Sequence, residues 1–228
     1  MHPSLRPLID KFQSGQPATL IAFGDSITFG SQIDPARDES MVYHKQWHDR
    51  MRERYPRLNL TIVNRGVPGH KITDAHARVQ SEVIDKQPDA AIVAFGINDC
   101  WDGLEKAEQF ERELERLVAR IRHACGASPI LMTTNMLNFR SSDAARRLAW
   151  FADQTAAAQN AGWTDEYMQR VRDVSARVDV PLADGYAKWQ QARHAGIDTD
   201  TLLVNLANHP NRQGHELLAD ALFEVFDE

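Results

Sequence analysis

Short apolar runs alternate along the chain with stretches that carry apolar residues at helical spacing. Runs typical of strands cover residues 18–23, 58–64, 89–96, 128–134 and 180–184. The run over 89–96 is apolar almost throughout, as expected of a strand covered on both faces. Helical periodicity covers residues 41–55, 72–86, 104–124 and 214–226. Strands that alternate with helices predict βαβ units, and therefore a parallel sheet between two layers of helices.

The chain of 228 residues contains no internal repeat and no linker, so we expect one domain over residues 1–228. Residues 138–165 form a longer segment than a simple connection needs. This segment carries Trp150, Phe151 and Trp163 among alanines and arginines. We interpret it as helical, either packed on the body of the domain or lying over the functional site as a lid.

Charge and hydropathy exclude several classes of partner. The net charge of −6, without a basic stripe, argues against a nucleic-acid-binding protein. No apolar stretch approaches the roughly 20 residues that a membrane span needs. The N-terminus lacks a basic segment followed by an apolar one, so we predict a cytoplasmic protein.

Histidines and cysteines give little sign of a metal site. Cys100 and Cys125 have no metal-ligand spacing and are too few for a disulfide framework, so we expect free thiols. His44 and His48 stand four residues apart on one predicted helix, a spacing that zinc can use. The Glu of the His-Glu-x-x-His motif and an evident third ligand are missing. We therefore favour two solvated histidines and predict no metal.

Polar, glycine-marked motifs follow the predicted strands. They are GDS at 24–26, NRGVPG at 64–69, GIND at 96–99 and, near the C-terminus, HPN at 209–211. In open parallel sheets, ligands bind outside the carboxyl ends of the strands. We expect the four motifs to converge on one cleft.

The residue types in these motifs suit acyl transfer. The hydroxyl of Ser26 needs a base to take its proton before it can attack a carbonyl. Histidine is the usual base, and His209 can supply it. The oxyanion that forms needs donors that are fixed beforehand. The backbone N–H of Gly69 and the carboxamide of Asn98 can supply them.

Taken together, the four motifs resemble the blocks of the SGNH (GDSL-type) hydrolases in order and spacing. The resemblance implies a three-layer α/β fold, flavodoxin-like, with a five-stranded parallel sheet in the order 2-1-3-4-5. It also implies an ester hydrolase without metal or organic cofactor. By position, Ser26 is the nucleophile and His209 the base, and the oxyanion hole is formed by the N–H groups of Ser26 and Gly69 and the side chain of Asn98. The Gly-x-Ser-x-Gly elbow of the α/β-hydrolases proper is absent around Ser26.

Three further residues are predicted to support the site. Asp25 is expected to tie the loop around the serine together. Asn64 is expected to shape the turn that leads to Gly69. Asn205 lies close to His209 in the sequence and carries an oxygen that could orient the histidine ring.

The chain departs from the family pattern at Leu206. An aspartate usually stands there, three residues before the histidine, and accepts the Nδ1 proton of the ring. Three replacements are open: a backbone carbonyl near Leu206, the amide oxygen of Asn205, or a carboxylate from Asp198 or Asp200. We favour the carbonyl.

The leading hypothesis is a serine esterase that acts on a small-molecule ester, with an acyl group such as acetyl on a carbohydrate, through an acyl-enzyme on Ser26. One alternative is an acyltransferase, in which an alcohol replaces water in the second step. The other is a non-catalytic carbohydrate-binding or scaffold protein that has lost the triad acid. The sequence does not indicate an oligomeric state.

Overall fold

The computed structural model describes residues 1–33, 36–141 and 149–227. Its centre is a five-stranded parallel sheet in the order β2-β1-β3-β4-β5, which confirms the predicted topology. The strands are β1 (Ala18–Gly24), β2 (Leu60–Gly66), β3 (Ala90–Ala94), β4 (Ser128–Thr133) and β5 (Leu182–Asp184). The central strands β1 and β3 are almost entirely buried, whereas the edge strand β2 is mostly half-buried. This difference explains why the central strands are the most apolar runs of the sequence.

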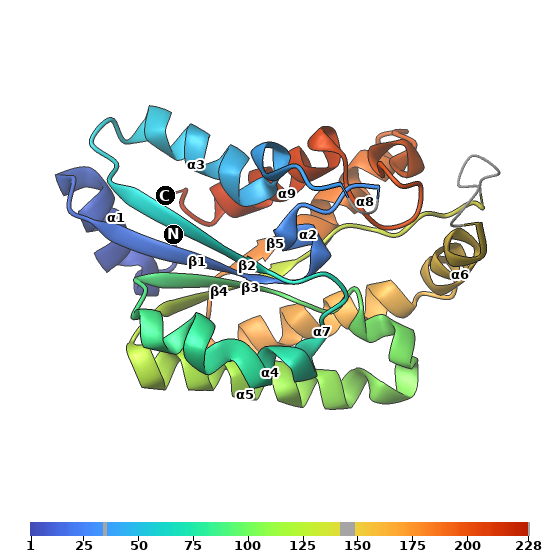
Figure 1. The fold of residues 1–228 in the computed structure, drawn as a ribbon, viewed down its shortest axis with the longest axis horizontal. Coiled ribbons are helices and arrows are strands. Elements are labelled where there is room, and N and C mark those ends of the chain that lie inside the picture. The colour runs from blue at the N-terminus through green and yellow to red at the C-terminus, as the bar shows by residue number, and fades with distance from the viewer. Residues whose placement is uncertain (34–35, 142–148, 228) are drawn as a thin grey trace.

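Helices cover both faces of the sheet (Figure 1). One face carries α3 (Tyr43–Arg54), α8 (Gly185–His194) and α9 (Arg212–Glu224). The other carries α4 (Ile72–Glu82), α5 (Ala107–Cys125) and α7 (Trp163–Val178). Helix α1 (Arg6–Ser14) precedes β1, the short α2 (Ser26–Phe29) follows it, and α6 (Ala149–Asn160) lies at the far end of the molecule from α1. The hydrophobic pattern did not predict α1, α7 or α8.

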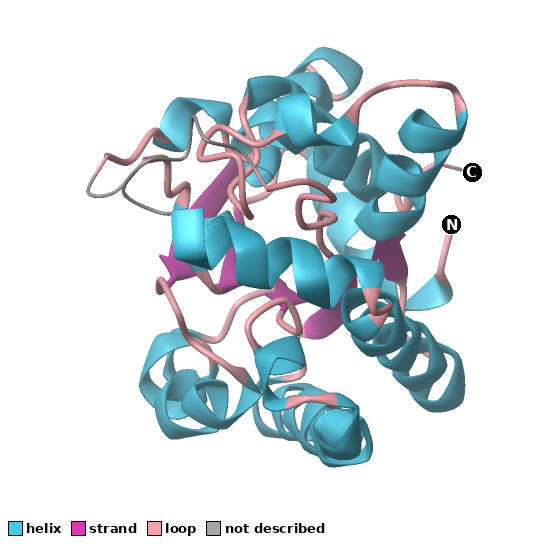
Figure 2. Ribbon diagram, turned by 90° about the vertical axis from the view of Figure 1, so that its right-hand side faces the viewer, coloured by secondary structure: helices cyan, strands magenta, loops and turns pink. Residues whose placement is uncertain are grey.

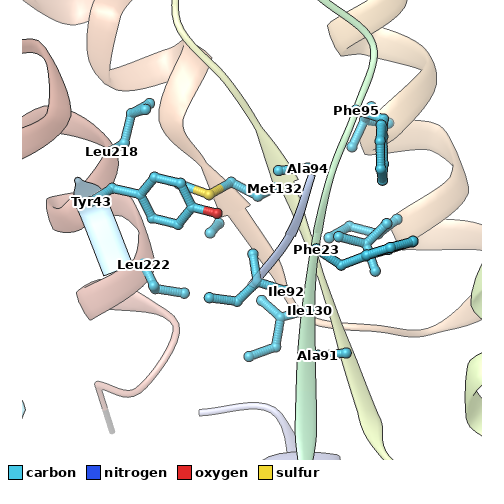
Figure 3. Close-up of a cluster of buried hydrophobic side chains, with 14 of the residues drawn as sticks. Phe23, Tyr43, Ala91, Ile92, Ala94, Phe95, Ile130, Met132, Leu218 and Leu222 are labelled. Carbon is cyan, nitrogen blue, oxygen red and sulfur yellow. The ribbon is translucent and has the colours of Figure 1, made fainter. Parts of the chain in front are cut away.

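Side chains on the two faces of the sheet form the two halves of the core, as Figure 3 shows. Phe23 and Phe95 lie on one side, with ring centroids 5.4 Å apart. The other side contains Ile92, Ile130 and Met132, which face Tyr43 of α3 and Leu222 of α9. This packing holds the strand ends, and the loops that follow them, in fixed positions.

The segment 138–165 is described only in part, because residues 142–148 lie outside the described residues. Its described helix α6 crosses the end of the sheet nearest to the viewer in Figure 2. Cys100 and Cys125 are free. Among the described helices, none combines the length and the apolar character that crossing a bilayer requires.

Candidate active site

The turn that carries Ser26 follows β1 without a linker. Ser26 is the first residue of α2 and is only 3 % exposed. Asp25 caps this helix, because its Oδ1 accepts a hydrogen bond from the backbone N–H of Ile27 at 2.9 Å. Burial raises the pKa of the Asp25 carboxyl to about 7. The N–H of Ser26 stands in the first turn of α2, where a helix supplies no acceptor for its own N–H groups.

Two glycines let this turn lie against the neighbouring strands. Gly24 and Gly66 are register partners at the carboxyl ends of β1 and β2. A Cβ on Gly66 would lie 2.2 Å from the backbone nitrogen of Phe29, and one on Gly24 would lie 2.2 Å from Oγ1 of Thr28. Asn64 fixes the end of β2, since its Oδ1 accepts the N–H of Gly66 at 2.9 Å. Gly24 and Gly66 are therefore required by close approach of the backbone.

Arg78 of α4 also holds the two strand ends, although no sequence motif pointed to it. Its guanidinium donates to the carbonyl of Gly24 at 2.7 Å and to that of Arg65 at 2.8 Å. It lies over the ring of Phe23, 4.5 Å from the centroid, and the residue is only 8 % exposed. The available signal was its position three residues after the buried Ala75, on the inner face of the helix.

The second and third motifs are joined to each other. The N–H of His70 donates to the carbonyl of Val67 at 3.3 Å and closes a β-turn with Gly69 at its third position. Gly69 has a φ of 77°, which side chains other than glycine adopt only with strain. The Nδ2 atom of Asn98 donates to the carbonyl of His70 at 3.0 Å. Because a carboxamide carries two N–H donors, Asn98 keeps a second one for a ligand.

The loop that carries His209 is organised by one side chain. Oδ1 of Asn205 accepts hydrogen bonds from three backbone N–H groups at 3.2, 3.0 and 2.9 Å. The donors are Ala207, Asn208 and His209. Nδ2 of Asn205 donates to Oδ1 of Asn208 at 2.8 Å. Both ends of the carboxamide are thus used inside the loop.

The ring of His209 is oriented from another part of the chain. Its Nδ1 lies 2.8 Å from the backbone carbonyl of Gln32, in the loop after α2. Since a carbonyl only accepts, Nδ1 carries the proton, and a neutral ring then has its lone pair on Nε2. The acceptor is a carbonyl, as favoured, but the predicted place near Leu206 is wrong. The 177 positions between Gln32 and His209 explain why local sequence could not reveal the pair.

The other candidate acceptors are engaged elsewhere. Asp198 forms an ion pair with Arg140, which lowers the pKa of the Asp198 carboxyl. Asp200 accepts the backbone N–H groups of Phe139 and Arg140 at 2.8 and 3.1 Å. Leu206 has a φ of 57° and lines a separate small cavity together with Arg140 and Asp200.

One cleft of about 610 Å³ brings most of the predicted residues together. Its lining includes Ser26, Gly69, Asn98, Asn205 and His209. Asp25 and Asn64 are not among its lining residues and act on the cleft only through the turns they hold. Gln32 and Trp101 also line the cleft, although no sequence motif pointed to them.

Among the described side chains, none joins the histidine pair on α3 to form a metal centre. Across residues 1–33, 36–141 and 149–227, no group of three or more His, Cys, Asp or Glu is arranged to hold a metal ion. The expectation that both histidines are solvated is wrong for His44, which is 3 % exposed. Its Nε2 donates to the carbonyl of Thr28 at 3.3 Å, and burial lowers its pKa to about 4. The helical pattern did not distinguish this inner position from the outer one at His48.

Known proteins resemble the chain along most of its length. An uncharacterized lipoprotein of Bacillus subtilis strain 168 is 31 % identical over 219 residues, which cover 89 % of this chain and 87 % of that protein. An acetylxylan esterase of Geobacillus stearothermophilus is 24 % identical over 225 residues, 91 % of this chain and 93 % of that one. A crystal structure of an acetylxylan esterase from the same species aligns with a TM-score of 0.67 and 24 % identity, over 92 % of this chain and 95 % of the other. Other crystal structures of that esterase are of catalytic mutants in which a serine, an aspartate or a histidine is replaced by alanine.

The family follows from a match over most of the sequence. The model of the GDSL-like lipase/acylhydrolase family matches residues 22–217, a range that contains all four motifs. The chain is therefore a carboxylic ester hydrolase that belongs to the GDSL-like lipase/acylhydrolase family.

Proposed function

We propose that the chain removes acetyl groups from carbohydrate through an acyl-enzyme on Ser26. The observation that carries this proposal is the cleft shared by Ser26, Gly69, Asn98 and His209, which come from four separate segments. The proposed acetyl group and carbohydrate are supported by the similarity to an acetylxylan esterase, which covers most of the length of both chains. The relatives' catalytic serine and histidine support the corresponding roles in this chain.

In the first half of the reaction, Nε2 of His209 takes the proton of the Ser26 hydroxyl as its oxygen attacks the acetyl carbonyl carbon. The oxyanion accepts hydrogen bonds from the N–H groups of Ser26 and Gly69 and from the second N–H of Asn98. The sugar oxygen then leaves with the proton from Nε2. The Gln32 carbonyl keeps Nδ1 as the donor, and its dipole helps to stabilise the imidazolium.

In the second half, water replaces the sugar. His209 takes a proton from this water as it attacks the acetyl-enzyme, and the same donors hold the second oxyanion. When that intermediate collapses, the bond to the Ser26 oxygen breaks, acetate leaves, and the serine regains a proton from Nε2. No redox partner or cofactor is needed to balance either step.

The test replaces the nucleophile and measures acetate released from an acetylated xylooligosaccharide. Ser26→Ala is expected to lower turnover by at least about 10⁴-fold, as loss of a catalytic serine does elsewhere. Ser14→Ala, the same change on the exposed end of α1, is expected to keep wild-type turnover. If folded Ser26→Ala kept more than a tenth of the wild-type rate, the proposal would be wrong.

A further inference from the structure

Helix α6 buries most of its alanines, whereas its two aromatic residues lie at the surface, with Trp150 exposed and Phe151 half-buried. Ala152 is 0 % exposed, Ala156 is 7 % and Ala158 is 2 %, whereas Trp150 is 63 % exposed. A helix that only covered a core would turn its rings inward, because a buried ring removes far more apolar surface from water than an alanine. The reversed arrangement indicates that the rings serve something outside the core.

The exposed face of α6 belongs to the catalytic cleft. Trp150, Phe151 and Gln154, which share one side of the helix, all line the cleft that contains Ser26. Figure 2 looks onto this end of the sheet, with α6 in front of the strand ends. Trp101, just after the third motif, lines the same cleft. The rings therefore face the reacting groups and not open solvent alone.

The three aromatic side chains form a continuous surface. The centroids of Trp101 and Phe151 are 5.8 Å apart, with 35° between their planes. Those of Trp150 and Phe151 are 5.9 Å apart, at 65°. We call Trp101, Trp150 and Phe151 the aromatic platform. Its members come from two segments about fifty residues apart, so their contact is a product of the fold.

The polar part of the cleft consists largely of carboxamides. Gln32, Gln154 and Asn208 line it together with the aromatic platform. Carboxamides donate and accept hydrogen bonds, as the hydroxyls of a sugar do. The C–H bonds on the face of a sugar ring are weakly positive and suit the negative face of an aromatic ring. A long acyl chain would instead leave these carboxamides without partners when it displaced their water.

We propose that the aromatic platform binds a sugar ring in the alcohol half of the ester. This inference rests on the proposed function, since it places the sugar that carries the acetyl group, or its neighbour in the chain, against Trp150 and Phe151. Gln154 then donates to a hydroxyl at the ring edge. The platform acts on binding and not on the bond-breaking step, because the reacting carbonyl lies at Ser26.

The test compares two acetate esters. Trp150→Ala is expected to raise KM for an acetylated xylooligosaccharide about tenfold, in the range measured for stacking of a planar ring on an aromatic side chain. Its kcat is expected to stay within about twofold of wild type. For glycerol triacetate, which has no ring face, both constants are expected to be unchanged. Ile197→Ala is the matched control, because Ile197 is also a large exposed apolar side chain, at 46 %.

A binding measurement separates this inference from the proposed function. Xylooligosaccharide without acetyl groups is titrated into Ser26→Ala protein, with and without Trp150→Ala, and tryptophan fluorescence is followed. Binding that weakens about tenfold without Trp150 supports the platform, even if the wild-type enzyme releases no acetate from any saccharide. Acetate release with an unchanged KM in Trp150→Ala overturns the platform and leaves the proposed function intact. Absence of saccharide binding to either protein also overturns it.

Discussion

The turn that holds Ser26 and the loop that holds His209 are stabilised in different ways. The serine turn is fixed by backbone packing, since neither Gly24 nor Gly66 leaves room for a Cβ. The histidine loop is fixed by polar bonds, three of which end on the single oxygen of Asn205. Ser26 is almost fully buried, whereas His209 is half-buried. The serine turn is therefore expected to be sensitive to added side-chain volume, and the histidine loop to the loss of one hydrogen-bond acceptor.

The two regions also depend on different parts of the fold. The serine turn is held by neighbouring strands and by Arg78, whose bond to the carbonyl of Gly24 is buried and whose bond to that of Arg65 is partly buried. The histidine ring depends on the carbonyl of Gln32, which belongs to the loop after the serine turn. A disturbance of the serine turn is thus expected to reach the histidine, whereas a disturbance of the histidine loop leaves the serine in place.

Gly66→Ala is expected to have the largest effect. The new Cβ would lie 2.2 Å from the backbone nitrogen of Phe29, and backbone cannot move aside as a flexible side chain can. We expect the free energy of unfolding to fall by about 3 kcal/mol and kcat/KM to fall by about a hundredfold or more, because Ser26 shifts. Urea denaturation and acetate release measure the two effects.

The control for this prediction is Gly126→Ala at the end of α5. A Cβ there meets nothing within 4 Å. The free energy of unfolding is therefore expected to fall only by the cost of an alanine at a φ of 69°, about 1 kcal/mol. Its kcat/KM is expected to match wild type. Equal falls in kcat/KM in the two variants would show that crowding of the serine turn does not cause the loss of activity in Gly66→Ala.

Asn205→Ala is expected to have the next largest effect. Three backbone N–H groups lose their acceptor, and the free energy of unfolding is expected to fall by about 2 kcal/mol. We expect kcat to fall about tenfold. The variant is expected to stay folded, with Ser26 still accessible to a fluorophosphonate probe. Asn160→Ala removes a carboxamide that makes one exposed bond, to the carbonyl of Phe139, and is expected to keep wild-type kcat. An unchanged kcat in Asn205→Ala would refute the role given to this side chain.

Leu206→Asp is expected to have the smallest effect, although it restores the residue that the family usually has. Leu206 lines a cavity with Arg140 and Asp200, apart from the cleft that contains Ser26. An aspartate there is expected to change kcat by less than about threefold, because Nδ1 of His209 already has the Gln32 carbonyl. Leu206→Asn, which also suits the positive φ, controls for charge. A tenfold rise in kcat for the aspartate alone would show that position 206 can reach the ring.

Much of the fold could be predicted because its signals are local. The five strands are short apolar runs, and the stripe of α5 at Phe110, Leu114 and Leu117 is buried as its spacing predicted. Glycine is required at Gly24 and Gly66 by close approach of the backbone, and at Gly69 by its φ of 77°. Long-range pairs could not be predicted, as the contact between His209 and Gln32 illustrates. Helix α6 could not be oriented either, since its rings face the cleft and not the core.

Several sequence-based expectations stay predictions. The roles of Ser26, Gly69, Asn98 and His209 in catalysis are supported by their common cleft, and their chemistry is a matter for experiment. The same holds for a single domain over residues 1–228, for a lid within 138–165 and for a cytoplasmic location.

The most direct measurement is fluorophosphonate labelling of the native enzyme, followed by peptide mass spectrometry. Such a probe reacts with a serine whose proton a neighbouring base can remove. We expect one labelled peptide, modified at Ser26, and a labelling rate at least about a hundredfold lower in folded His209→Ala. Label on another residue, or an equal rate at Ser26 without the histidine, would contradict the pairing of Ser26 with His209.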